Sequence, residues 1–184
     1  MPDNAVLQRF ADAVRTVAPN ASGPPIGITE AGNLIVRAFL EAGVFALLAI
    51  TAILWLALRR LSDVVLALGP LVLAGIWTLE FAALIGLPLN FANVIALPLM
   101  FGVGIAFHVY YLIAWRNGVA DVLASSLTRA IFFSALTTGT AFGSLWASSH
   151  PGTSSMGELL AISLVFTLIG AFLVVPAFLG PPRT

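Results

Sequence analysis

The sequence contains no cysteine and no lysine, and only 9 % of its 184 residues are charged. Without cysteine the chain can form neither disulfides nor thiolate metal sites. A soluble domain has about 25 % charged residues, whereas 60 % of this chain is hydrophobic and its mean hydropathy is +1.05. The formal net charge of zero argues against nucleic acid as a partner, because nothing would neutralise a row of phosphates. Most of the chain is therefore expected to lie in a lipid bilayer.

The first 36 residues differ from the rest of the chain. Residues 3–18 carry apolar side chains at helical spacing and predict a short amphipathic helix. Residues 20–25 break it, and residues 26–29 predict a brief strand. One helix and one strand cannot bury a core by themselves. Residues 1–36 are therefore interpreted as the C-terminal remnant of a periplasmic domain.

The remaining residues contain apolar runs long enough to cross a bilayer, for which about 20 residues suffice. A shorter, mixed stretch at about 118–129 predicts a helix that lies at the membrane interface. The five predicted spans cover residues of about 37–58, 64–87, 91–115, 130–148 and 157–179. Residues 37–184 are thus expected to form an all-α transmembrane domain.

Arginine predicts the orientation of these spans. The loops at 86–90 and 149–156 contain no arginine, whereas the ends that alternating crossings place on the other side contain Arg59, Arg60, Arg116, Arg129 and Arg183. The positive-inside rule makes the arginine side cytoplasmic. The N-terminal segment then lies outside, in the periplasm of a Gram-negative cell, and the C-terminus inside. Because no signal-peptide core precedes this arrangement, the chain is better explained as the C-terminal part of a longer one.

His108 is the main candidate for chemistry. It lies in the third span, about eight residues before Arg116 and hence about 12 Å of helix from the cytoplasmic end. An ionised side chain at mid-membrane costs about 2.5–3.5 kcal/mol, so such residues usually face the protein interior and are functional. Imidazole also changes its charge near neutral pH, as a proton-coupled step requires. The alternative is a neutral histidine that only hydrogen-bonds a neighbouring helix.

Glu80 and a stripe on the fourth span are further candidates for proton coupling. Glu80 and His108 differ in depth by about 15 Å, so they are not expected to pair, and Glu80 is expected at the outer interface or a polar cavity. The stripe lies on one helical face and favours close helix packing, with a proton relay to His108 as the alternative. It consists of Ser134, Thr137, Ala141, Ser144 and Ser148.

Prolines and glycines mark candidate hinges and packing sites. Pro98 removes a helical hydrogen bond and predicts a kink in the third span, and Gly69–Pro70 interrupts the second. Small residues four apart let helices approach closely. Such pairs are Gly102 with Ala106 and Gly157 with Ala161.

The sequence does not favour an enzyme. Gly102 and Gly104 form a Gly-x-Gly pattern, but it lies mid-membrane and opens no strand-to-helix turn, so it does not indicate a nucleotide site. A nucleophile elbow, a phosphate-binding loop and paired carboxylates are not found. No catalytic residue, cofactor or metal is therefore predicted.

Two segments resemble the C-terminal half of resistance–nodulation–division (RND) transporters: LNFANVIALPLMFGVGIAFHVYYLIAWR and SSLTRAIFFSALTTGTAFGSLWASSHPGTSSMGELLAISL. The likeness is closest to the hopanoid-associated members, which are grouped with the lipid-exporting MMPL-type proteins. It covers nearly the whole chain, and the SSHPGTSSMG loop with its flanks is quite specific. Such transporters have twelve transmembrane helices in two repeats, each with a large periplasmic α/β porter insert after its first helix. The resemblance implies that the five spans match helices eight to twelve.

The resemblance also implies a function. It implies proton-driven movement of hopanoid-like lipids from the bacterial inner membrane toward the outer membrane. The implied partners are membrane lipids and the missing N-terminal half of the transporter, and a homo-oligomer is left open. Two alternatives remain: an exporter of other lipids or drugs, and a non-transporting, sterol-sensing-like lipid binder.

The resemblance bears on His108 as well. Relatives can carry a Gly-x-Gly-x-Asp-Tyr pattern in the tenth helix, where this chain has Gly102-Val-Gly104-Ile-Ala106-Phe107 and therefore lacks the carboxylate. Drug-exporting relatives instead use a basic residue in that helix against acids in the fourth. His108 lies near the position of that basic residue, and the resemblance implies the same role for it.

Overall fold

The structure is a computed structural model that describes residues 4–119 and 122–179, and every regular element in these ranges is helical. The elements are α1 (Asn4–Val17), α2 (Pro24–Leu58), α3 (Leu61–Leu84), α4 (Ala96–Arg116), α5 (Ser126–Trp146), α6 (Pro151–Ile169), the π-helical segment η1 (Gly170–Val174) and α7 (Val175–Leu179). The predicted N-terminal helix is confirmed as α1.

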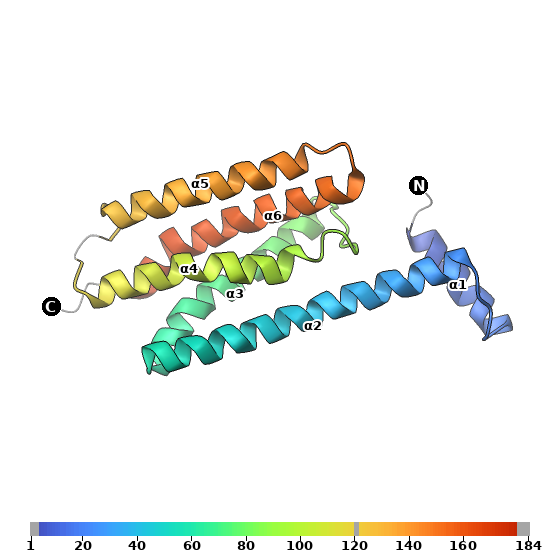
Figure 1. Cartoon of the computed structure of the whole chain (residues 1–184), viewed down its shortest axis with the longest axis horizontal. Helices are drawn as coiled ribbons and strands as arrows, with labels where there is room; N and C mark the ends of the chain where they lie inside the picture. The colour runs from blue at the N-terminus through green and yellow to red at the C-terminus, as the bar shows by residue number, and fades with distance from the viewer. Residues whose placement is uncertain (1–3, 120–121, 180–184) are drawn as a thin grey trace.

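The helices from α2 to α7 form an elongated bundle organised around α4 (Figure 1). α4 packs against α2, α3, α6, η1 and α7, and α5 packs mainly on α6. α3 crosses the bundle obliquely, and α1 lies at the outer end of the long helix α2 (Figure 1). The larger apolar cluster surrounds the C-terminal half of α4, with Phe107, Tyr111, Leu112 and Trp115 among its buried members. α4 therefore offers enclosed positions for a functional side chain, as does the stretch Pro151–Leu179.

Four helical segments are long and apolar enough to cross a membrane: α2, α3, α4 and the continuous stretch Pro151–Leu179. Their length and composition are those of membrane-spanning helices. The fourth predicted span, at about 130–148, corresponds to α5, which has 21 residues but is not among the four. Its many serine, threonine and glycine residues lower its hydropathy.

The predicted strand at residues 26–29 is wrong, because these residues lie inside α2. Pro24 and Pro25 occupy the first turn of α2, where a missing N–H costs nothing and the fixed φ favours a helix. The part of the chain that the structure describes contains no strand, so the α/β character of the N-terminal remnant is not seen. α2 also continues without a break past residue 36, the predicted end of the periplasmic remnant.

The interfacial helix predicted at about 118–129 is not observed. Gly118 and Val119 follow the end of α4, residues 122–125 form turns, and α5 begins at Ser126; residues 120–121 lie outside the described ranges. Gly118 has a φ of 77°, which ends the helix in the left-handed region that glycine tolerates. The Ser125 side chain accepts a hydrogen bond from the Thr128 N–H and caps α5. Local capping therefore overrides the weak amphipathic pattern.

The kink predicted at Pro98 is also wrong. α4 begins only at Ala96, so Pro98 lies in its first turn, where proline is tolerated. Residues 91–95, which were expected to open the third span, form turns. The proline inside a helix is Pro70, which lies in the middle of α3 and is buried.

The α5–α6 hairpin closes on Gly157. A Cβ added there would lie 2.2 Å from the Trp146 backbone nitrogen and 2.6 Å from the Leu145 carbonyl carbon. Two backbones approach each other here with no room for a side chain. The predicted packing role of Gly157 is therefore matched by a close contact, whereas a Cβ at Gly102 would meet nothing within 4 Å.

Arginine-bearing ends gather at one end of the bundle. The α2–α3 turn, the end of α4 and the start of α5 lie together there, opposite the N-terminus (Figure 1). These places contain Arg59, Arg60, Arg116 and Arg129; Arg183 lies outside the described residues. The connections at the other end, residues 85–95 and 147–150, contain no arginine.

Candidate functional site

His108 lies in the core of the bundle, with no solvent-exposed surface. Its Nδ1 atom is 2.9 Å from the carbonyl oxygen of Gly104, one turn earlier in α4. A carbonyl can only accept a hydrogen bond, so this contact makes Nδ1 the donor, and in the neutral ring Nε2 is then a bare acceptor. Nε2 is buried, and none of the described residues hydrogen-bonds to it. The ring therefore has one fixed nitrogen and one that is free to take a proton.

The free Nε2 atom faces a place where two other helices come close. A Cβ added at Gly170 would lie 3.1 Å from Nε2 and 3.2 Å from the carbonyl oxygen of Pro70. Gly170 opens the π-helical segment η1, and such segments are often found at functional sites. Pro70 interrupts the hydrogen bonding of α3. Three elements thus meet around one imidazole: α4, the proline-interrupted helix α3, and the π-helical segment η1, which begins with glycine.

A buried polar face of α6 continues this site. Ser163 and Thr167 are 2 % and 1 % exposed, and with Gly170 they follow at spacings of four and three. The Thr167 hydroxyl has no hydrogen-bond partner among the described residues. Sequence reasoning missed these residues, although their spacing is the one that singled out the stripe on α5.

Gly104 lets α6 approach α4. A Cβ at Gly104 would lie 2.6 Å from Leu71 Cδ1 and 2.9 Å from Thr167 Cγ2. Gly104 thus lies in close contact with α3 and α6, while its carbonyl oxygen orients His108. Ala106 is half-buried on the same helix.

The stripe predicted on α5 does not face His108. Its residues Ser134, Thr137, Ala141 and Ser144 are exposed, whereas α5 turns Ile131 and Ala135 into the core. Two hydroxyls donate to carbonyls of their own helix: Thr137 to Phe133 at 2.6 Å and Ser144 to Ala141 at 2.7 Å. Among the described residues, these four exposed side chains therefore do not line the His108 site.

Glu80 is also remote from His108. It is exposed four residues before the end of α3 and lines an open groove with aromatic and aliphatic side chains, among them Trp77 and Phe166. The salt bridges of the described residues include neither Glu80 nor His108. No group of three metal-ligating side chains comes together in residues 4–119 and 122–179.

One ion pair joins α3 to α4 at the arginine-bearing end. Arg116 Nη1 lies 3.1 Å from Asp63 Oδ2, although the N–H is not aligned for a hydrogen bond. The Asp63 side chain is 7 % exposed and that of Arg116 is 29 % exposed. Asp63 also lies in the first turn of α3, where the helix dipole stabilises a carboxylate. Sequence reasoning did not pair these two residues.

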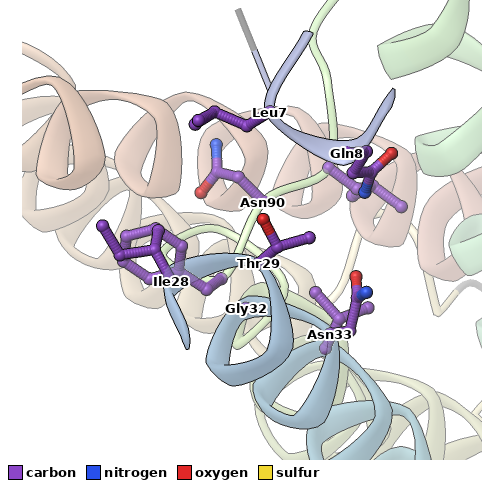
Figure 2. Close-up of a pocket in the computed structure, with 10 residues that line it drawn as sticks. Leu7, Gln8, Ile28, Thr29, Gly32, Asn33 and Asn90 are labelled. Atoms are coloured by element: carbon purple, nitrogen blue, oxygen red, sulfur yellow. The ribbon is translucent and has the colours of Figure 1, made fainter. Parts of the chain in front are cut away.

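A pocket lies at the other end of the bundle, between α1, the start of α2 and the α3–α4 connection (Figure 2). Its labelled lining side chains are uncharged and include Gln8, Thr29, Asn33 and Asn90. The Asn90 side chain accepts hydrogen bonds from the backbone N–H groups of Ala92 and Asn93, so it shapes its own loop. The pocket contains none of the residues predicted to couple protons.

The chain is similar in sequence to two known proteins. The chain is 59 % identical over 181 residues to the hopanoid transporter HpnN of Rhodopseudomonas palustris (strain TIE-1). It is 54 % identical over 181 residues to the hopanoid transporter HpnN of Burkholderia multivorans (strain ATCC 17616 / 249). The predicted resemblance is confirmed. Each match covers 98 % of this chain.

The chain spans about a fifth of the length of these curated relatives, since each match covers 21 % of the relative. No protein-family model matches the chain. Both relatives are named as transporters, in agreement with a bundle of apolar helices in whose core His108 is buried.

Proposed function

We propose that the chain is part of a proton-driven RND-type exporter that moves hopanoid-like lipids from the bacterial inner membrane toward the outer membrane. The observation that carries this proposal is the identity of 59 % to a hopanoid transporter over 98 % of the chain. We further propose that the chain has no enzymatic activity. Its substrate would be a membrane lipid, and its partner the remainder of a transporter of the relatives' length.

The proposed topology has five spans, with α5 as the fourth. α5 is as long as α4, and its hydroxyls are supplied with acceptors by its own carbonyls, which lowers their cost in lipid. α5 begins at the arginine-bearing end of the bundle, so a crossing by α5 carries the chain to the opposite end, where α6 begins (Figure 1). The positive-inside rule makes that end cytoplasmic, with the N-terminal segment in the periplasm and the C-terminus in the cytoplasm.

His108 is the proposed proton-coupling residue. Protonation at Nε2 would create a charge in a place with no exposed surface, on an atom that has no hydrogen-bond partner among the described residues. A buried charge without a partner is costly, so protonation favours a second arrangement of α3, α4 and η1 in which Nε2–H finds an acceptor or water. The membrane potential contributes about 2.3 kcal/mol per charge per 100 mV to such a change. A proton gradient can thereby select between two states of the bundle.

The remaining candidates are proposed to act with partners outside this chain. Glu80, Thr137 and Ser144 are exposed here, so a role in proton coupling requires groups that the rest of the transporter supplies. Small and hydroxyl side chains on an exposed helix face suit close packing against a further transmembrane helix. The proposed packing positions are Gly102 and the half-buried Ala106 on α4, and Ser134, Thr137, Ala141 and Ser144 on α5.

The His108→Ala variant tests the proposal in the full-length transporter. Delivery of hopanoids to the outer membrane is expected to fall to the level of a deletion strain, because no protonatable group remains at the centre of α4. The measurement is lipid analysis of the separated outer membrane, together with proton flux into proteoliposomes of the purified protein. Export of other lipids in place of hopanoids, or lipid binding without proton flux, would favour the two alternatives.

Leu112→Ala is the matched control. Leu112 lies four residues after His108 in α4 and is equally buried, so the variant opens a core cavity but keeps the imidazole. It is expected to retain hopanoid delivery and proton flux, with both variants monodisperse in detergent. Unchanged delivery in a well-folded His108→Ala variant would contradict the assigned role.

A further inference from the structure

A small cavity lies between α4, α5 and α6, next to the His108 site. Its polar lining comes from Gly104, Ser163 and Thr167. Four apolar side chains complete the wall: Met100, Val103, Phe142 and Leu164. The cavity has room for about one water molecule.

Thr167 contributes a hydroxyl without a hydrogen-bond partner to this cavity. The residue is 1 % exposed, and its Oγ1 atom is buried without a hydrogen-bond partner among the described residues. A buried hydroxyl without a partner costs about 1–3 kcal/mol, and a valine of the same shape would avoid that cost. Thr78 shows the usual solution, since it is equally buried and donates to the carbonyl of Ala74 at 2.7 Å. The Thr167 hydroxyl is therefore placed for a small polar ligand.

One water molecule satisfies the polar groups of the cavity. A buried water requires two to four hydrogen-bond partners. The Thr167 hydroxyl can donate to it or accept from it, and the Ser163 hydroxyl, which donates to the Leu160 carbonyl at 2.8 Å, still has lone pairs that accept. The apolar remainder of the wall would disfavour a larger polar ligand.

The Thr167 hydroxyl and the His108 ring both adjoin Gly104. Side chains of a helix tilt toward its N-terminus, and the imidazole of His108 accordingly reaches back to the Gly104 carbonyl. A Cβ at Gly104 would lie 3.5 Å from Thr167 Oγ1. One turn further along, Gly170 faces Nε2 of the same ring. Thr167 thus lines the cavity and adjoins Gly104, the residue whose carbonyl oxygen accepts a hydrogen bond from His108 Nδ1.

The charged groups of the neighbouring helices are occupied or distant. On α3, Asp63 pairs with Arg116, and Glu80 is exposed near the other end of the helix. On α2, Glu30 pairs with Arg15, and Glu41 pairs with Arg37. Glu158 lies in the second turn of α6, Arg129 in the first turn of α5, and η1 and α7 contain no charged residue. Tyr111, one turn from His108, hydrogen-bonds to Thr128 at 2.7 Å.

We propose that this cavity binds one water molecule, and that this water and the Thr167 hydroxyl form the path by which His108 exchanges its proton. The inference rests on the proposed proton-driven function and assigns its pathway to α6. The Thr167 oxygen and Nε2 are not hydrogen-bonded to each other in this arrangement of the helices, so the transfer belongs to the second arrangement proposed above, in which Nε2 gains a partner. There, an excess proton on the water passes to the Thr167 oxygen while the hydroxyl proton passes to Nε2. The step leaves a neutral water, an intact hydroxyl and a protonated imidazole.

The test is proton flux in proteoliposomes of the full-length transporter, measured with a pH-sensitive dye under an imposed pH gradient. Thr167→Val keeps the shape of the side chain and removes its hydroxyl, and its flux is expected to fall to that of His108→Ala. Thr167→Ser keeps the hydroxyl and is expected to restore the flux. Thr78→Val, at an equally buried threonine that bonds its own helix, is expected to behave as the wild type. Thr167→Ala serves as a second variant if valine prevents folding.

The outcomes separate the inference from the proposed function. Wild-type flux in folded Thr167→Val or Thr167→Ala protein would overturn the water path while leaving proton-driven export in place. Equal losses in Thr167→Ser and Thr167→Val would also overturn it, because the hydroxyl would then not be the decisive group. A wild-type protein that exports hopanoids without any proton flux would overturn both the proposed function and the path.

Discussion

Replacing Gly157 by alanine is expected to abolish most of the correctly folded protein. The added Cβ would lie 2.2 Å from the Trp146 nitrogen and 2.6 Å from the Leu145 carbonyl carbon, both of which are backbone atoms that cannot rotate away. Overpacking of a core costs about 1–3 kcal/mol, and more where the backbone must shift. The α5–α6 hairpin would have to open at its outer end. The measurement is the monodisperse fraction of the full-length protein in detergent, with its unfolding midpoint followed by tryptophan fluorescence.

Alanine variants of two other glycines serve as controls. Gly102→Ala adds a methyl group where nothing lies within 4 Å, so folding is expected to be unchanged. Gly104→Ala is expected to be intermediate, because its Cβ would meet the side-chain tips of Leu71 and Thr167, which can move. An equal yield of Gly157→Ala and Gly102→Ala would contradict the close backbone approach.

Replacing Arg116 by methionine is expected to cost about 3 kcal/mol of stability. The change leaves the Asp63 carboxylate buried without its partner, and an uncompensated buried charge is strongly destabilising. The value lies at the low end of the usual range because Arg116 is 29 % exposed. The measurement is the shift of the unfolding midpoint in detergent or in a denaturant titration.

A double variant and an exposed pair provide the controls. Asp63→Asn combined with Arg116→Met removes both charges and is expected to recover most of the loss. Arg37→Met breaks the exposed pair with Glu41 and is expected to cost less than about 1 kcal/mol. A double variant as unstable as Arg116→Met alone would show that packing of the arginine stem, rather than its charge, holds α3 to α4.

Long apolar runs predict where several of the helices lie but not where each begins, since α2 starts at Pro24, well before the span predicted at 37–58. The runs at 64–87 and 157–179 differ by a few residues from α3 and from the stretch α6 to α7. Local signals that depend on short patterns were less reliable. The strand at 26–29 and the interfacial helix at 118–129 were predicted from a few residues each, and proline pairs and caps decided the outcome instead.

The faces of the helices do not follow from the sequence alone. α5 and α6 both carry hydroxyl and small residues at spacings of three and four, yet only the face of α6 with Ser163 and Thr167 is buried. In a nearly uniformly apolar helix the periodicity that marks the inner face of a soluble helix is weak. Tertiary contacts therefore decide which stripe meets His108. The depth of His108 could be predicted from its position in the span, but its neighbours could not.

The length of α2 has a mechanical consequence. Its 35 residues extend for about 52 Å, well beyond a hydrocarbon core of about 30 Å. Its two prolines lie in its first turn, so no proline hinge interrupts the rod. A swing of about 10° around the Arg59 end would carry the Pro24 end through about 9 Å. As a lever arm, α2 would thus enlarge small shifts in the bundle into larger displacements of α1, which packs against it at its far end.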